Sequence, residues 1–131
     1  MSLRRLLIAA LWLVSLVLAY GVGGFRFMPP PQPPSPLIEG LSGSWDAASE
    51  ELNRRVQAAF PVGSSEAAMA QTLKGQDFHL MTWNAKPGEE KEAVRVHYTV
   101  ICGIASSISW QIDDAAKITA IKARYHEIGC L

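Results

Sequence analysis

The first quarter of the chain is dominated by one apolar run. Residues 6–18 (LLIAALWLVSLVL) contain a single polar side chain, and no charged residue interrupts the 20 positions from Leu6 to Phe25. About 20 apolar residues are needed to span the roughly 30 Å hydrocarbon core of a bilayer. Arg4 and Arg5 precede the run, as basic residues do in secretory signals and signal-anchors. This pattern predicts a transmembrane or signal helix within residues 1–27.

Two outcomes fit this helix. A retained anchor would leave the N-terminal arginines in the cytoplasm and export everything after Arg26, which describes a single-pass protein of a bacterial-type inner membrane with its C-terminal domain in the periplasm. Cleavage after Ala19 or Gly21 would instead release a secreted or periplasmic domain. The length of the run favours the anchor, in which Leu6 to Phe25 contact the lipid bilayer. A buried helix of a soluble domain fits the flanking arginines less well.

Residues 28–40 are predicted to form a proline-rich spacer. Met28–Pro36 (MPPPQPPSP) contains six prolines, which fix the backbone angle φ and remove amide donors. Such a tract adopts an extended polyproline II conformation, and at about 3.1 Å per residue these positions span roughly 25–30 Å. We therefore expect a semi-rigid linker that holds a folded domain, residues 41–131, clear of the membrane.

Two amphipathic helices are predicted at the start of this domain. Ser44 is a typical N-cap, and apolar side chains follow it at the spacing of one helix face, at Trp45, Ala48, Leu52, Val56 and Ala59. A second, shorter helix begins at Ser64 or Ser65, carries Met69 and Leu73 on one face, and ends at Gly75. The glycine is expected to adopt the left-handed conformation that closes many helices.

From Asp77 onward the apolar positions alternate with a period of two, as in β-strands. Strands are predicted at residues 77–84, 93–102, 107–112 and 118–125. In the second strand an apolar series alternates with a polar one that contains Arg95 and His97, and in the third strand Ile108, Trp110 and Ile112 point inward. Short connections favour an antiparallel meander. The predicted fold class is α+β: two N-terminal helices packed on an antiparallel sheet of three or four strands, preceded by the transmembrane or signal helix.

Five positions at the second predicted helix follow a recognisable spacing: Gly63, Ser65, Met69, Leu73 and Gly75. In this pattern a glycine and a hydroxyl residue precede a short helix, and a leucine and a glycine end it. The pattern resembles the opening of the small periplasmic SmpA/OmlA lipoproteins, the family that includes BamE. The resemblance covers about half of the chain and implies an α-α-β-β-β order. Lys74 separates the leucine from the glycine, and no cysteine for acylation follows the apolar run. An inner-membrane anchor would also put the domain at a different membrane from the family's barrel-insertion complex.

The net charge of the domain argues against nucleic acid as a partner, and its two cysteines are typical of an exported protein. Beyond Pro36 the chain carries 9 basic and 12 acidic side chains, and this net charge of −3 does not favour nucleic acid. Cys102 and Cys130 are the only cysteines, and exported proteins commonly pair theirs in disulfides. Such a bond would close a loop of 29 residues and contribute about 3–4 kcal/mol. A buried free thiol at Cys102 and a reactive or metal-binding pair are the alternatives.

No catalytic, cofactor-binding or metal-binding residue is predicted. His79, His97 and His126 are scattered; the first two could face one another on adjacent strands, and Glu127 could join His126. Zinc requires three or four converging ligands, and no local spacing enforces that. Surface histidines are therefore the expected outcome.

The predicted function is a non-enzymatic interaction or assembly module that binds another envelope protein. The outer face of the first strand carries His79, Met81 and Trp83, which would form an exposed patch and mark a partner site if nothing covers them. The alternative is a small exported ligand-binding or metal-dependent hydrolytic domain that uses His79, His97 and nearby acidic residues.

Overall fold

The computed structural model describes residues 8, 10–18, 30–81 and 85–131, and the chain divides into two compact units, Met1–Gln32 and Pro33–Leu131. In the first unit, residues 11–18 are helical with exposed side chains. Within the described ranges, no helix is both long enough and apolar enough to cross a membrane. The predicted span from Leu6 to Phe25 extends outside those ranges.

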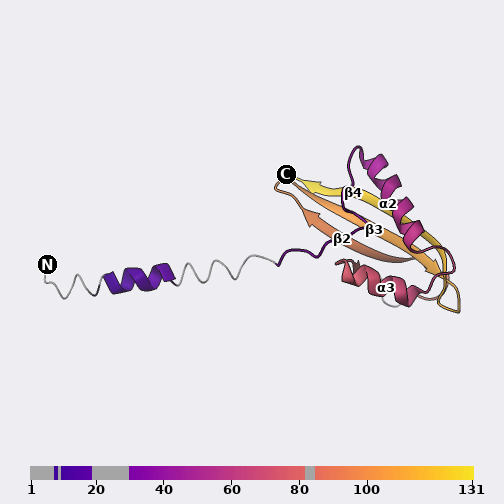
Figure 1. The fold of residues 1–131 in the computed structure, drawn as a ribbon, viewed down its shortest axis with the longest axis horizontal. Helices are drawn as coiled ribbons and strands as arrows, with labels where there is room; N and C mark the ends of the chain where they lie inside the picture. The colour runs from indigo at the N-terminus through magenta and orange to yellow at the C-terminus, as the bar shows by residue number, and fades with distance from the viewer. Residues whose placement is uncertain (1–7, 9, 19–29, 82–84) are drawn as a thin grey trace. The chain divides into compact units, whose positions relative to one another are not determined.

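The second unit is an α+β domain, as predicted, with a four-stranded antiparallel sheet in the order β1-β2-β3-β4. Figure 1 shows β2, β3 and β4 side by side in this sheet. Each strand pairs with the next one in the sequence, so the predicted meander is confirmed. The elements in chain order are α2 (Trp45–Ala59), α3 (Glu66–Gly75), β1 (His79–Leu80), β2 (Lys91–Tyr98), β3 (Cys102–Ile112) and β4 (Ile118–Cys130).

Helix α2 begins where the sequence predicts. The Ser44 side chain accepts a hydrogen bond from the amide of Ala47 at 3.2 Å and so caps the helix. Leu52 and Val56 are fully buried, as expected, whereas Trp45 is 44% exposed. The Trp45 ring lies beside the ring of Tyr125, with centroids 5.7 Å apart, so it packs on the rim of the core rather than inside it.

Helix α3 buries Met69 and Leu73, which confirms the predicted apolar face. Its end differs from the prediction: Gly75 is still helical, and the left-handed residue is Asp77, with φ of 63°. An aspartate tolerates this conformation better than most side chains, so the chain turns two residues later than expected.

Both helices contribute to one core on one face of the sheet, called here the inner face. The buried cluster joins side chains of α2 and α3 to those of β3, namely Leu52, Val56, Met69, Leu73, Ile108, Trp110 and Ile112. The predicted inward series of the third strand is thereby confirmed. A polar contact accompanies this core: Glu66 Oε1 accepts hydrogen bonds from Lys91 Nζ at 2.7 Å and from Trp110 Nε1 at 2.9 Å. This carboxylate ties α3 to both β2 and β3.

The strand boundaries differ from the predicted ones at the β2–β3 connection. The predicted strand 93–102 ends at Tyr98, and Cys102 opens β3 instead. Thr99 explains the turn, because its Oγ1 accepts a hydrogen bond from the amide of Cys102 at 2.9 Å. The following Gly103 allows close packing: a Cβ at this position would lie 2.9 Å from Ile128 Cγ1.

Residues 33–41, here called the N-terminal arm, belong to the folded unit. The domain was predicted to begin at residue 41 after a spacer over 28–40, but Ser35 and Leu37 are 4% and 5% exposed, and Leu37 joins the core. Arg55 of α2 explains the packing, because its Nη1 donates to three backbone carbonyls of the arm, at 2.7 Å in the case of Glu39. The second half of the predicted spacer is therefore part of the domain.

Candidate functional site

The inner face of the sheet changes chemical character along its strands. Residues directly opposite one another on paired strands point to the same face. Ala93, Ile108 and Ala123 form one such line across β2, β3 and β4, called here the apolar row. The next line on the same face consists of Arg95, Ser106 and Tyr125, called here the polar row.

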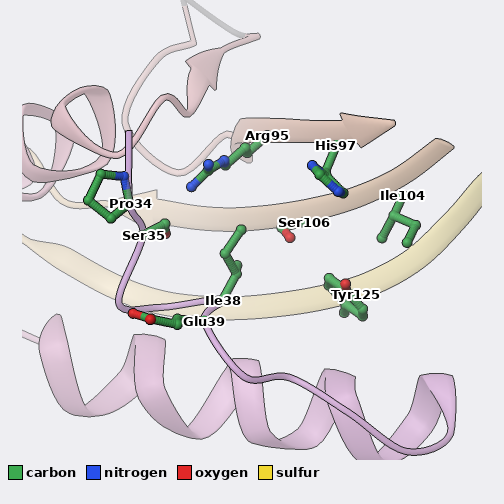
Figure 2. Close-up of a pocket in the computed structure, with 9 residues that line it drawn as sticks. All are labelled: Pro34, Ser35, Ile38, Glu39, Arg95, His97, Ile104, Ser106 and Tyr125. Atoms are coloured by element: carbon green, nitrogen blue, oxygen red, sulfur yellow. The ribbon is translucent and has the colours of Figure 1, made fainter. Parts of the chain in front are cut away.

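A cavity of about 330 Å³ lies between the polar row and the N-terminal arm (Figure 2). The arm contributes Ile38 and Glu39, and the following line of the inner face contributes His97 and Ile104. The cavity therefore combines aliphatic walls with charged and hydroxyl-bearing side chains, a composition typical of ligand sites.

Arg95 is the most unusual residue of this cavity. It comes from the middle of β2, is only 6% exposed, and extends toward Pro34 and Ser35 of the arm (Figure 2). Its Nη2 donates a hydrogen bond to the carbonyl of Pro33 at 2.9 Å. Its Nε and Nη1 are buried and have no hydrogen-bond partner in the described part of the structure. Buried polar atoms normally have partners, so these two nitrogens are donors that a further hydrogen-bond acceptor could satisfy.

The other side of the cavity is held in place by a network that runs from α2 to the arm. The Ser35 hydroxyl donates to Gln76 Oε1 at 2.6 Å. Glu51 accepts hydrogen bonds from Arg54 and from Arg55, the residue that holds the arm. The two guanidinium groups lower the pKa of Glu51 to about 2. The arm is thus held by side-chain hydrogen bonds and by the burial of Leu37 rather than by pairing with the sheet.

A larger hollow of about 550 Å³ on the opposite face of the sheet provides a contrast. It is also lined by charged residues, but there acid and base are paired: Lys122 Nζ lies 3.0 Å from Glu90 Oε2. Both partners are more than half exposed, so water solvates them as well. The Arg95 cavity differs from this hollow because its cation is buried and lacks a charged partner in the described structure.

The structure does not bring the predicted histidines together. His79 lies opposite Val94, and Val94 and His97 are three residues apart on β2, so the two histidines are on opposite faces of the sheet. His126 and Glu127 are neighbours on β4 and also point to opposite faces. The pairings on which the alternative of a metal or hydrolytic site depended are therefore not formed, and of the three histidines only His97 lines the Arg95 cavity.

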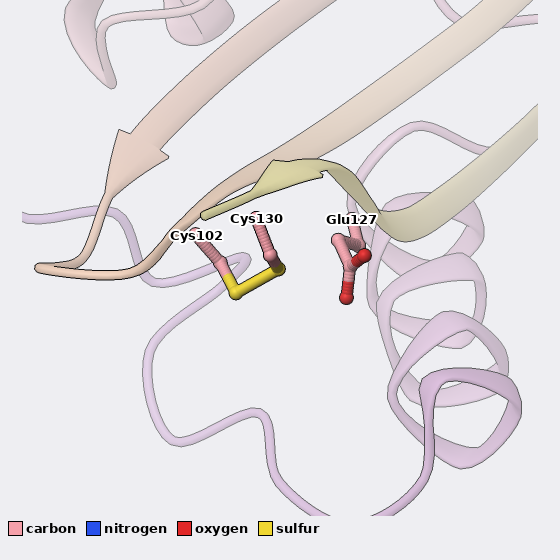
Figure 3. Close-up of side chains that lie close together, drawn as sticks. All are labelled: Cys102, Glu127 and Cys130. Carbon is pink, nitrogen blue, oxygen red and sulfur yellow. A yellow bond between two sulfur atoms is a disulfide. The ribbon is translucent and has the colours of Figure 1, made fainter.

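Cys102 and Cys130 form a disulfide, as predicted. The predicted geometry placed Cys102 at the end of the second strand, whereas the two residues lie directly opposite one another on β3 and β4. Glu127 lies beside the bond, with the sulfur and carboxylate ligand atoms within 4.8 Å of one another (Figure 3). Bonded sulfur atoms lack the thiolate charge that a metal requires, so this group is a cross-strand bond with an adjacent carboxylate.

The predicted partner patch on β1 is partly described. The His79 side chain is 75% exposed and Met81 is 61% exposed, while Trp83 lies outside the described residues. His79 Nε2 is 3.7 Å from Asp77 Oδ1. These side chains are accessible to a partner, and whether a partner binds there stays a prediction.

The sequence pattern did not indicate Arg95 as a site residue. The larger apolar residues Val94 and Val96 suggested that their face of β2 would be the buried one, yet both are only half-buried and the Arg95 face meets the core. One signal was present: on β3 the inward apolar series is interrupted only at Ser106, directly opposite Arg95.

No protein-family model, curated protein or solved structure matches this chain. The resemblance to the SmpA/OmlA family therefore stays a prediction, and the functional argument depends on the geometry of the domain.

Proposed function

We propose that this chain is a membrane-anchored, exported module that acts by binding an envelope protein partner, and that the partner inserts a group into the Arg95 cavity. The buried guanidinium with two unpartnered nitrogens carries this proposal. A buried cation without a partner is unfavourable by several kcal/mol, and a bound group of the right chemistry removes that cost.

Export is supported by two independent features. The apolar run from Leu6 to Phe25 follows Arg4 and Arg5, as in signal-anchors. The disulfide between Cys102 and Cys130 is of a kind that persists in oxidising compartments such as the periplasm. Together they favour a domain held outside a bacterial-type inner membrane.

Binding accounts for the cavity better than catalysis does. A guanidinium donates hydrogen bonds but cannot accept a proton, so Arg95 is suited to recognition. A serine nucleophile needs a base within about 2.6–3.2 Å. Ser106 lies opposite Arg95 rather than His97, and the Ser35 hydroxyl is engaged with Gln76. The alternative of metal-dependent hydrolysis loses its support because His79 and His97 lie on opposite faces.

Site-directed photocrosslinking in intact membranes tests the binding proposal. A photoreactive amino acid at His97, at the cavity, is expected to capture a discrete partner. The same group at Lys122, on the opposite face, serves as the matched control because both residues are exposed. Equal adducts from both positions, or none from His97, would contradict the proposal.

A reporter phosphatase that folds only in an oxidising compartment tests export when it is fused after Leu131. Activity is expected for the natural chain and loss of activity is expected when Leu13 and Val14 are both changed to Arg, because charges in an apolar run oppose membrane insertion. An inactive fusion protein that is recovered intact from the cytoplasm would rule out the anchor and the signal peptide alike.

A further inference from the structure

The unusual property of the cavity is its uncompensated charge. Arg95 carries a guanidinium group and is 6% exposed. Glu39 lines the same cavity but forms no ion pair with Arg95 in the described structure. Among the described residues, the guanidinium donates its hydrogen bond to a neutral carbonyl, that of Pro33. The group that completes the site must therefore be an anion with hydrogen-bond acceptors.

The walls of the cavity restrict what that anion can be. One guanidinium supplies one positive charge, and Glu39 adds negative charge to the same cavity. A phosphate group carries more than one negative charge near neutral pH, so it fits this balance poorly. A carboxylate carries a single charge and accepts hydrogen bonds in the geometry that guanidinium groups favour.

The aliphatic lining indicates what accompanies the anion. Ile38 from the arm and Ile104 from β3 border the cavity together with the Tyr125 side chain, as Figure 2 shows. A volume of about 330 Å³ is at the small end of ligand sites and suits a group of the size of a leucine side chain with its carboxylate.

We infer that Arg95 binds the carboxylate of a ligand that carries a branched aliphatic group next to it, whether a free acid or the C-terminal end of a peptide. This inference rests on the proposed binding function and does not depend on export. The carboxylate accepts hydrogen bonds from the guanidinium, and the aliphatic group packs on Ile38 and Ile104. Since Nε and Nη1 are buried beside the arm, the arm shifts as the ligand enters.

Calorimetric titration of the full-length chain in detergent micelles with N-acetylleucine tests this inference. The natural protein is expected to bind saturably, and Arg95→Met is expected to weaken binding about 10- to 100-fold, as the loss of a hydrogen bond to a charged group predicts. Arg124→Met is the matched control, because it removes an exposed arginine from the opposite face and should leave the affinity unchanged.

Further ligands separate the chemistry and its source. N-acetylleucinamide, which has the same shape without the charge, should bind at least about tenfold more weakly. If the protein binds 4-methylpentanoate as tightly as N-acetylleucine, a free branched acid is sufficient for binding. If it clearly prefers N-acetylleucine, the natural ligand is the C-terminal end of a peptide. Both results support a carboxylate site.

Three outcomes would overturn the inference. Tighter binding of inorganic phosphate than of N-acetylleucine would do so while leaving the proposed binding function intact, since photocrosslinking at His97 tests that function separately. Failure of the natural protein to bind any of the carboxylates would also overturn it. The third outcome concerns the free energy of unfolding. If Glu39→Gln lowers it in the natural protein but not in the Arg95→Met variant, then Glu39 is already the counterion of Arg95.

Discussion

The apolar row and the polar row are neighbours on the same three strands and the same face, yet they have different roles in the molecule. Both are buried on β2 and β3, where Ala93 and Ile108 are 0% exposed and Arg95 and Ser106 are 6% and 2% exposed, and both are half-buried on β4. In the first row burial removes apolar surface from water and stabilises the fold. In the second row it removes a charge and leaves two donors that have no partner among the described residues. The comparison shows that burial alone does not identify a structural residue.

The two rows also differ in what covers them. The apolar row belongs to the core that α2 and α3 complete, so it is exposed only when the domain unfolds. The polar row borders the N-terminal arm, which Arg55 holds by hydrogen bonds to its backbone carbonyls. A segment held in this way can shift without unfolding of the sheet.

The largest effect is expected in the apolar row. Ile108→Ala should lower the free energy of unfolding by about 2–5 kcal/mol, because it leaves a cavity in a fully buried site. Ser106→Ala, one line further along β3, removes no aliphatic group and should cost less than about 1 kcal/mol. Urea unfolding of both variants measures the difference, and equal losses would show that the two rows do not differ as described.

The disulfide gives the next largest effect, at the end of the sheet beyond the polar row. Replacing both Cys102 and Cys130 by Ala should cost about 3 kcal/mol, because the bond closes a long loop in the unfolded chain. Thermal unfolding measures the loss. Hydrogen exchange should increase more at Ile104 than at Trp110, and uniform exchange along β3 would contradict a local role for the bond.

In contrast to these losses of stability, Arg95→Met is not expected to destabilise the protein in the absence of ligand. The substitution loses one hydrogen bond to Pro33, but it also removes an unpaired buried charge, so stability should stay the same or rise by about 1 kcal/mol. Urea unfolding tests the sign. A loss of more than about 3 kcal/mol would mean that the guanidinium is already compensated and serves the fold.

The smallest effect concerns the support of the arm at low pH. Because the pKa of Glu51 is lowered to about 2, its ionised form stabilises the folded state above its ordinary pKa of 4.5, and this contribution is lost as the pH falls from about 4.5 to about 2. Glu51→Gln should therefore show a shallower loss of stability over this window than the natural protein. Identical acid unfolding curves would show that Glu51 does not support the Arg55 contacts to the arm.

Much of the fold could be predicted because its signals are local. The Ser44 cap, the four-residue spacing of Met69 and Leu73, and the alternation from Ile108 to Ile112 each report contacts within one element. The disulfide was predicted from the cysteine count and from the expectation of export, although the predicted strand geometry around it was wrong.

The candidate site could not be predicted because it depends on contacts between distant segments. Val94 and Val96 are more hydrophobic than Ala93 and Arg95, so the pattern favoured the wrong face of β2. Only the register with β3 and the arm, 62 residues away at Pro33, places Arg95 inside the domain. The proline tract likewise gave no local sign that Arg55 would hold its end.

We propose above all that the buried guanidinium of Arg95 binds an anionic ligand. The nuclear magnetic resonance signal of the Arg95 side-chain Nε–H tests this proposal most directly. The signal is assigned by its disappearance in Arg95→Met. On titration with N-acetylleucine it should move downfield and saturate, while the Arg124 signal stays in place, because a carboxylate then accepts a hydrogen bond from the guanidinium. An Arg95 signal that remains unmoved at saturating ligand would contradict the claim.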